Sequence, residues 1–166
     1  MTQRGPVSRE EPHPVAPRTR TAFLVRLLSN TLSQQVERAL KPLSLTQAQL
    51  AALAQLTFSE EGWLSGAELG RRAGVTAQAM SGAITDLERR GLVRRSPHPT
   101  QGRIQRVHLT EDGAQLLDRA QQLTEPVDAR ALALLTESER EQFRSLLLRV
   151  MTGSGCALTA EHVPGE

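Results

Sequence analysis

Two short helix signals followed by two short strand signals constrain the fold of this 166-residue chain more than any other feature. Ser65-Gly66-Ala67-Glu68 has the form of a capping box and predicts a short helix that ends at Gly74. Thr76 predicts the N-cap of a second helix, which carries apolar residues at helical spacing and ends at Gly91. Two helices joined through a glycine form a helix-turn-helix pattern, although any helical hairpin can produce the same signal.

The residues after Gly91 make the pattern more specific. Two runs are strand-like, Leu92-Val93-Arg94-Arg95 and Ile104 to Leu109. The loop between them, Ser96 to Arg103, is rich in Pro, Thr and Gly. A helix-turn-helix followed at once by a basic β-hairpin is typical of a winged helix-turn-helix. Thr110 then predicts the cap of the next helix.

Apolar residues at three- and four-residue steps predict further helices on both sides of this core. The first begins near Thr19 and ends at Pro42, and the second follows the capping box Thr46–Gln49. Beyond the wing, one helix is expected to break or kink at Pro126, and the last follows the capping box Thr136–Glu139. The chain has 25 Leu and 19 Ala against 10 Val and 2 Ile. This composition favours a mainly α fold with a small β-wing.

We therefore expect a single domain over residues 18–152, with a winged helix-turn-helix core flanked by N- and C-terminal dimerisation helices. The flanking helices carry more Leu-rich surface than the winged core can cover, and a partner subunit is the natural place for it. The expected segments are a disordered tail (1–17), dimerisation helices (18–45), the winged lobe (46–110, with its wing at 92–109), dimerisation helices (111–152) and a flexible tail (153–166).

The charge is unevenly distributed. The whole chain carries +2, whereas the segment from Arg71 to His108 carries +6 and the remainder −4. Because the basic segment coincides with the winged motif, it predicts binding to double-stranded DNA; the alternative is a solvated face of arginines with i,i+4 partners. The arginines expected at phosphates are Arg71, Arg72, Arg89, Arg90, Arg94, Arg95, Arg103 and Arg106. The residues expected at base edges are Thr76, Ala77, Gln78, Ser81 and Thr85.

Several classes of function are not expected from the residues present. No nucleophile elbow, phosphate loop, metal cluster or paired-carboxylate site is recognisable, so we expect no enzyme activity and no cofactor. The four histidines, His13, His98, His108 and His162, have no i,i+4 pair and predict no zinc site. Cys156 is the single cysteine, and it is either an inert tail thiol, an intermolecular disulfide partner or a redox sensor. No apolar run approaches 18 residues and no signal peptide is recognisable, so a soluble, cytoplasmic protein without a membrane partner is expected.

The stretch "SGAELGRRAGVTAQAMSGAITDLERRGLVRRSPHPTQGRIQRVHLTEDG" resembles the DNA-binding core of the MarR family of bacterial transcription regulators, and the preceding "LSLTQAQLAALAQL" is similar to its flank. The resemblance extends from about Thr19 to Met151. It implies a homodimer whose winged lobes sit on successive major grooves of a palindromic operator, and a repressor that a small-molecule effector releases. Two positions depart from the family pattern: Gly82 stands where an Arg is frequent, and Gln101 replaces the Asp that commonly holds Arg103, the wing arginine.

The resemblance also implies an apolar effector pocket with a few polar anchors. Its expected lining residues are Leu24, Arg26, Leu28, Phe58 and Trp63. Trp63 has a second interpretation, as packing between the second helix and the winged lobe. For the chain as a whole, the alternative function is a winged-helix protein-interaction module without specific DNA binding. Steep salt dependence of binding to a palindromic duplex would separate the two.

Overall fold

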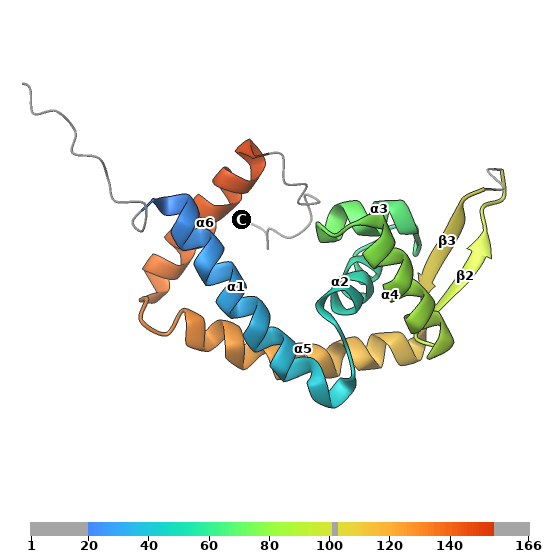
Figure 1. The fold of residues 1–166 in the computed structure, drawn as a ribbon, viewed down its shortest axis with the longest axis horizontal. Coiled ribbons are helices and arrows are strands. Elements are labelled where there is room, and N and C mark those ends of the chain that lie inside the picture. Colours follow the sequence, from blue (N-terminus) through green and yellow to red (C-terminus); the bar gives the residue numbers. More distant parts are fainter. Residues whose placement is uncertain (1–19, 101–102, 155–166) are drawn as a thin grey trace, which may run out of the picture. The chain divides into compact units, whose positions relative to one another are not determined.

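The computed structural model describes residues 20–100 and 103–154 (Figure 1). It divides into two compact units, Met1–Thr31 and Leu32–Glu166, with the boundary inside the first helix. Several sequence predictions fall outside the described residues: the tail 1–17, all but the start of the tail 153–166, and the residues His13, Gln101, Cys156 and His162.

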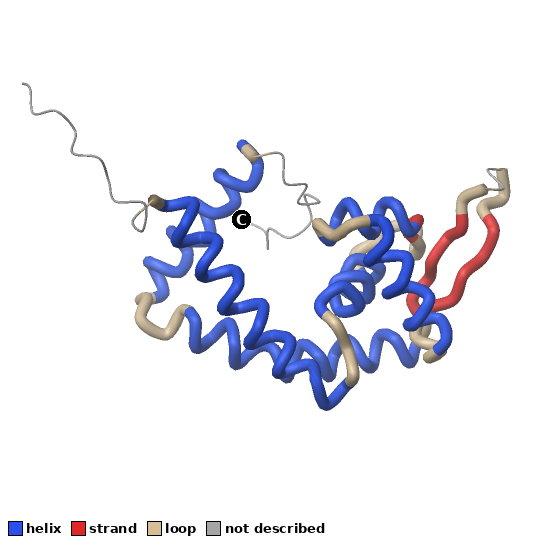
Figure 2. Tube along the Cα trace, in the orientation of Figure 1, coloured by secondary structure: helices blue, strands red, loops and turns tan. Residues whose placement is uncertain are grey.

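The described elements are mainly helical (Figure 2), as the composition predicts. In chain order they are α1 (Thr21–Leu40), the 3-10 turn η2 (Lys41–Leu43), α2 (Gln47–Thr57), β1 (Leu64–Ser65), α3 (Gly66–Ala73), α4 (Ala77–Arg89), β2 (Val93–Pro97), β3 (Gln105–Leu109), α5 (Glu111–Ala131) and α6 (Glu137–Gly153).

The three strands in the described part of the chain form an antiparallel sheet in the order β1-β3-β2. In β2, Val93 lies opposite Leu109 and Pro97 lies opposite Gln105, which confirms the predicted hairpin. The strand β1, in which Leu64 pairs with Val107, is not predicted from the sequence. Two residues are too few to show an alternating pattern, so periodicity gives no signal there.

The helix-turn-helix pair is held together by close packing at a glycine. Gly70 is buried, and a Cβ at this position would lie 3.5 Å from Cβ of Met80 and 3.4 Å from the carbonyl oxygen of Val75. Gly74 ends α3 with φ of 65°, a left-handed conformation that glycine adopts without strain. Both glycines therefore have the roles expected of a helix-turn-helix.

The connection from the wing to α5 depends on Thr110 and Gly113. Thr110 caps α5 by accepting from Gly113 N at 3.1 Å, and its hydroxyl donates to the carbonyl of Gly91 at 2.8 Å. A Cβ on Gly113 would overlap the carbonyl oxygen of Leu92 and lie 2.8 Å from Cδ1 of Leu109. The helix can therefore start this close to the wing only with glycine at position 113.

The hydrophobic core reaches beyond the predicted lobe boundaries of 46 and 110. Leu40, Leu43 and Leu45 belong to the same buried cluster as the winged helices, and so do Leu117 and Ala120 from α5. The end of α1 and the first half of α5 are thus part of the core that supports the winged lobe.

The predicted capping boxes and the predicted break or kink at Pro126 have different outcomes. The capping boxes at Thr46 and Thr136 both form in full, with reciprocal bonds to Gln49 and Glu139. At Pro126, where a break or a kink is expected, the break is wrong because α5 continues through this residue to Ala131, and the kink stays a prediction. An interior proline removes one backbone hydrogen bond of the helix, and the other turns of this 21-residue helix keep theirs.

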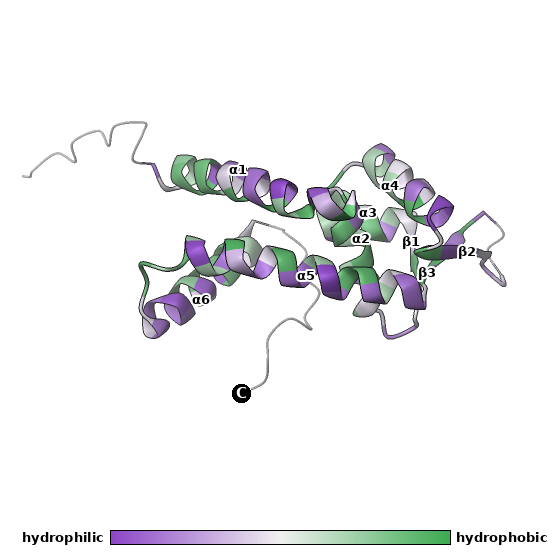
Figure 3. Cartoon of the chain, turned by 90° about the horizontal axis from the view of Figure 1, so that it is seen from below, coloured by the Kyte–Doolittle hydropathy of each residue, from purple (hydrophilic) through white to green (hydrophobic). Residues whose placement is uncertain are grey.

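Apolar side chains remain exposed on the helices outside the winged core. On α6, which contains no buried residue, Leu146 is 48% and Val150 is 64% exposed. In the first unit, the N-terminal half of α1 exposes Leu24, Leu27 and Leu28, and Figure 3 colours much of this segment as hydrophobic.

Candidate nucleic-acid interface

The outer face of α4 presents the residues expected at base edges. Thr76 caps the helix by accepting from Ala79 N at 3.2 Å, and Met80 and Leu87 are fully buried on the inner face. The residues on the outer face, Thr76, Ala77, Gln78, Ser81, Gly82 and Thr85, are all exposed. A Cβ on Gly82 would meet nothing within 4 Å, so this face is open at its centre.

Thr85 and Arg95 connect this face to the wing. The Thr85 hydroxyl donates to the Ser81 carbonyl at 2.9 Å and accepts from Nη2 of Arg95 at 3.0 Å. Arg95 also forms an ion pair with Glu88 at 3.4 Å. The Arg95 guanidinium is therefore fixed against α4 from β2, and the Thr85 hydroxyl is already engaged in both directions.

Arg71 and Arg72, at the end of α3, share one carboxylate. Arg71 donates to both oxygens of Glu68, at 2.9 and 2.5 Å, and Nε of Arg72 donates to Oε1 at 2.7 Å. These hydrogen bonds lower the pKa of Glu68 from 4.5 to about 2. This role of Glu68 is not among the sequence predictions, although its i,i+3 and i,i+4 spacings to Arg71 and Arg72 indicate ion pairs on a helix.

The same contacts explain why the capping box predicted at the start of α3 forms only in part. Ser65 accepts from Glu68 N at 3.2 Å, as the predicted capping box requires, but the reciprocal bond from the Glu68 side chain is not part of this cap. Two guanidinium groups offer the carboxylate stronger, charge-assisted hydrogen bonds than one backbone N–H does.

The arginines at the end of α4 are also engaged. Arg89 donates to Asp86, and this contact is the main reason why the pKa of Asp86 is lowered. Arg90 donates to the carbonyl oxygens of Ser44 at 2.9 Å and Leu43 at 3.0 Å. Arg90 therefore does not face outward as expected, because it satisfies carbonyl groups of the 3-10 turn that precedes α2.

The wing carries the arginines that stay available. Arg94 and Arg103 are exposed, and neither guanidinium forms a hydrogen bond or an ion pair within residues 20–100 and 103–154. Alternation along β2 places Arg94 on the opposite face of the sheet from Arg95, which contacts α4. The basic segment thus contains both arginines paired with acids and two exposed wing arginines that have no acidic partner among the described residues. The paired arginines are Arg71, Arg72, Arg89 and Arg95.

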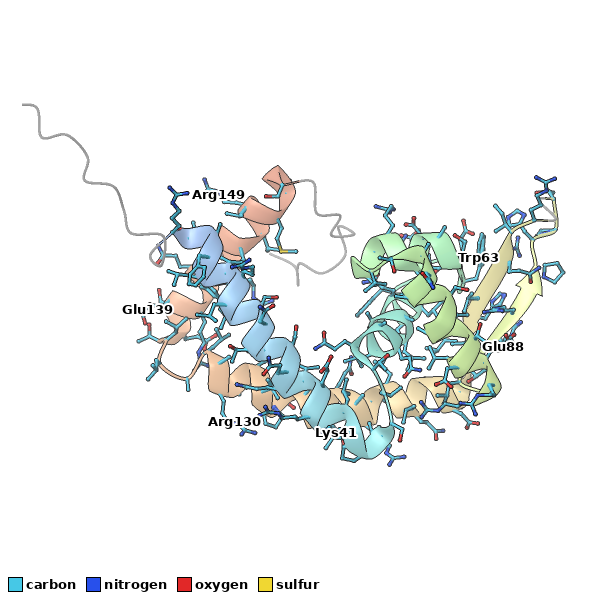
Figure 4. The ribbon with its side chains drawn as sticks, in the orientation of Figure 1. Lys41, Trp63, Glu88, Arg130, Glu139 and Arg149 are labelled. Atoms are coloured by element: carbon cyan, nitrogen blue, oxygen red, sulfur yellow. The ribbon has the colours of Figure 1, made fainter. Side chains whose placement is uncertain are left out.

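Arg106 has an aromatic partner. Its guanidinium carbon lies 4.6 Å from the centroid of the Trp63 ring, in cation–π geometry. The Trp63 ring also meets His98 edge-on, with centroids 5.4 Å apart. Trp63 therefore lies beside the strands of the wing (Figure 4), and its packing between the second helix and the lobe stays a prediction.

His108 joins the wing to the residue before Trp63. Its Nδ1 lies 3.1 Å from the carbonyl oxygen of Gly62, and its Nε2 lies 2.8 Å from the hydroxyl of Ser96. A ring that donates from Nδ1 and accepts at Nε2 satisfies both contacts in the neutral form. Burial, helped by the nearby charge of Arg94, lowers the pKa of His108 and favours that form.

The residues expected around an effector lie in different parts of the chain. Leu24, Arg26 and Leu28 are on α1, where the Arg26 guanidinium lies 5.6 Å from the centroid of the Phe23 ring. Phe58 is the C-cap of α2, and Trp63 lies at the wing. Their grouping into one pocket stays a prediction.

Two further features are absent from the described ranges. No group of three or more His, Cys, Asp or Glu side chains there could hold a metal ion. No helix among these residues is long and apolar enough to cross a membrane.

The comparisons with known proteins agree with this geometry. A sequence model described as the MarR family matches residues 43–104. The HTH-type transcriptional repressor Rv2887 of Mycobacterium tuberculosis is 37% identical over 125 residues, which cover 75% of this chain and 88% of the relative.

Solved structures share the fold. The M. tuberculosis MarR family protein Rv2887 in complex with salicylic acid matches with a TM-score of 0.63 and 35% identity, covering 78% of this chain and 97% of that one. A mutant of MarR from E. coli in complex with operator DNA matches with a TM-score of 0.69 over 78% of this chain and 92% of that one. At 24% identity, this second likeness concerns the fold alone.

Proposed function

Because the chain belongs to the MarR family of transcription regulators, we propose that it is a homodimeric repressor that binds double-stranded operator DNA. One observation carries this proposal: an exposed, polar α4 face lies next to a wing whose arginines Arg94 and Arg103 have no acidic partner among the described residues. A helix fits the major groove, and cations without partners can exchange counterions for phosphates. In this function the chain is not an enzyme, and it works in the cytoplasm, where bacterial DNA is.

The two surfaces would contribute differently. Gln78 lies in the first turn of α4, where a side chain can hydrogen-bond adenine at two positions. Arg103 would contact the DNA backbone or the narrow minor groove, where it carries little sequence information. Arg71, Arg72 and Arg89 would reach phosphates only by leaving Glu68 or Asp86, so their contribution is smaller than their charge implies.

A dimer would cover the apolar surface of α6 and double the DNA contacts. Leu146 and Val150 are exposed on this helix, and such side chains are typical of a subunit interface when they lie on one helical face. Two recognition helices related by a twofold axis would then read two half-sites of a palindrome.

The effector is proposed as a small aromatic carboxylate. The relative Rv2887 has been crystallised with salicylic acid and with p-aminosalicylic acid, both of this chemical class. An effector must bind the form that does not fit the operator more tightly, since otherwise it cannot shift the equilibrium. A thermal-shift titration with salicylate tests binding, and the same titration on the operator complex tests release.

Two substitutions test the DNA-binding function. Duplexes selected from a random pool provide a preferred sequence and scrambled controls. Arg103→Ala should weaken binding to all duplexes about equally, whereas Gln78→Ala should bring the affinities for preferred and scrambled duplexes closer together. Equal loss of discrimination in both variants would refute this division, and no binding of the unchanged protein at low salt would favour a protein-interaction module.

A further inference from the structure

A cluster of side chains attaches the wing to the loop that precedes β1. We call it the wing clamp and define it by Trp63, His98, Arg106 and His108, together with the Gly62 carbonyl. Trp63 contacts Arg106 and His98, and His108 contacts Gly62. The backbone of this loop is itself fixed, since the Ser59 hydroxyl donates to the Trp63 carbonyl at 2.7 Å. The clamp thus joins a braced loop to both strands of the wing.

The outer half of the wing has little other support. A two-stranded hairpin is marginal in water on its own, and β1 pairs with only two residues of β3, Leu64 with Val107 and Ser65 with Arg106. Beyond Arg106 the wing continues as two strands only, through the pair of Pro97 with Gln105, to the loop that carries Arg103. Arg106 is the last residue of β3 that β1 pairs with, and His98 follows β2 in the two-stranded part, so the Trp63 ring contacts the wing where its third strand ends.

Arg106 depends on the ring as its partner. Its Nε is buried and has no hydrogen-bond partner in the described part of the chain. The cation–π contact with Trp63 at 4.6 Å is therefore the interaction that holds this guanidinium in place. Indole is the strongest of the aromatic side chains for such a contact.

We propose that Trp63 is a positioning residue for DNA binding: by holding Arg106 and His98, it fixes the orientation of the wing and of Arg103 relative to α4. This inference rests on the proposed function, because the wing arginine must meet DNA for its orientation to matter. A fixed wing loses less conformational freedom on binding than a mobile one, so the clamp raises affinity without contacting DNA.

The test compares five proteins on the preferred duplex: the unchanged chain, Trp63→Leu, Trp63→Phe, Arg103→Ala and the double variant Trp63→Leu/Arg103→Ala. We expect Trp63→Leu to weaken binding about tenfold, and Trp63→Phe to recover most of this loss because a ring is kept. The slope of log Kobs against log salt should stay the same in Trp63→Leu, which removes no cation, and should become shallower by about 1 in Arg103→Ala. In the double variant, the added effect of Arg103→Ala should be smaller than in the unchanged background.

Hydrogen exchange of the free proteins gives a readout that needs no DNA. In Trp63→Leu, the backbone amides of β3 should exchange faster, while those of α2 and α4 keep their protection. Faster exchange in α2 and α4 as well would mean a general loss of stability and would overturn the inference.

The outcomes separate the two proposals. If the unchanged chain binds DNA but Trp63→Leu binds equally well, or Arg103→Ala has its full effect in both backgrounds, the positioning role is overturned and the DNA-binding function stands. If the unchanged chain binds no duplex, both proposals are overturned.

Discussion

At the scale of single residues, the same substitution at two glycines is expected to change the free energy of unfolding in opposite directions. A Cβ on Gly113 would overlap the Leu92 carbonyl, whereas a Cβ on Gly82 would meet nothing within 4 Å. Gly113→Ala should lower the free energy of unfolding by at least about 2 kcal/mol, because the start of α5 must move away from the wing. Urea denaturation followed by circular dichroism measures this change.

Gly82→Ala is the matched control, since it adds the same methyl group in the middle of α4, at a position with open space around it. It should raise the free energy of unfolding by about 0.5–1 kcal/mol through helix propensity alone. A loss of stability at Gly82, or no loss at Gly113, would contradict the packing described for these two positions.

The lowered pKa of Glu68 predicts that the free energy of unfolding depends on pH. Its pKa is lowered to about 2 in the folded chain, so its ion pairs stabilise the fold fully above the unfolded value of 4.5 and lose this effect as the pH falls toward 2. Glu68→Gln should therefore be less stable than the unchanged chain at pH 7, and the difference should shrink below pH 4.5. Urea denaturation of both proteins at pH 7, 4 and 2.5 measures it, and a difference independent of pH would argue against this charge effect.

At the scale of elements, a buried glutamine connects α2 to α4. Gln49 is 5% exposed; its Oε1 accepts from Thr46 N at 2.9 Å, and its Nε2 donates to Oδ2 of Asp86 at 2.7 Å. Both polar atoms of the amide are thus engaged. Gln49→Ala should lower the free energy of unfolding by about 1–3 kcal/mol, because it removes a cap bond and leaves a cavity.

Gln49→Glu is the informative comparison, since it keeps the volume and the cap but places a carboxylate beside Asp86. It should destabilise the protein at pH 7 and recover in acid, where one carboxyl group takes up a proton. Thermal denaturation of Gln49→Glu and of the unchanged chain, at pH 7 and in acid, measures this change in stability. Equal stability of the two proteins at pH 7 would contradict the Gln49–Asp86 contact.

The helices and strands also show which features of the fold and of the site can be predicted from the sequence. Caps, helix ends and the hairpin follow from local signals, and the structure confirms those at Thr46, Thr76 and Thr110. The partners of side chains do not follow from such signals, since Trp63 meets Arg106 only after two segments 43 residues apart fold together. Glu68 lies between the two cases, because its spacing to Arg71 is local but its choice between cap and guanidinium depends on relative strength.

At the scale of the whole molecule, the exposed apolar side chains of α6 predict a dimer. Leu146→Glu with Val150→Glu should convert dimer to monomer, because charges in an apolar interface are costly to bury. Light scattering after size exclusion gives the mass directly. Arg144→Glu, on the opposite side of the same helix, is the control and should remain dimeric. A monomeric unchanged chain would contradict the homodimer.

The central claim is that α4 and the wing bind duplex DNA through exposed polar residues and through arginines that have no acidic partner in the described part of the chain. It is tested most directly by the salt dependence of binding to the selected palindromic duplex, measured by fluorescence anisotropy for the unchanged chain and for Arg94→Ala/Arg103→Ala. We predict a linear fall of log Kobs with log salt, and a slope that becomes shallower by about 2 per subunit in the variant. No binding at low salt, or a slope that the variant leaves unchanged, would contradict the claim.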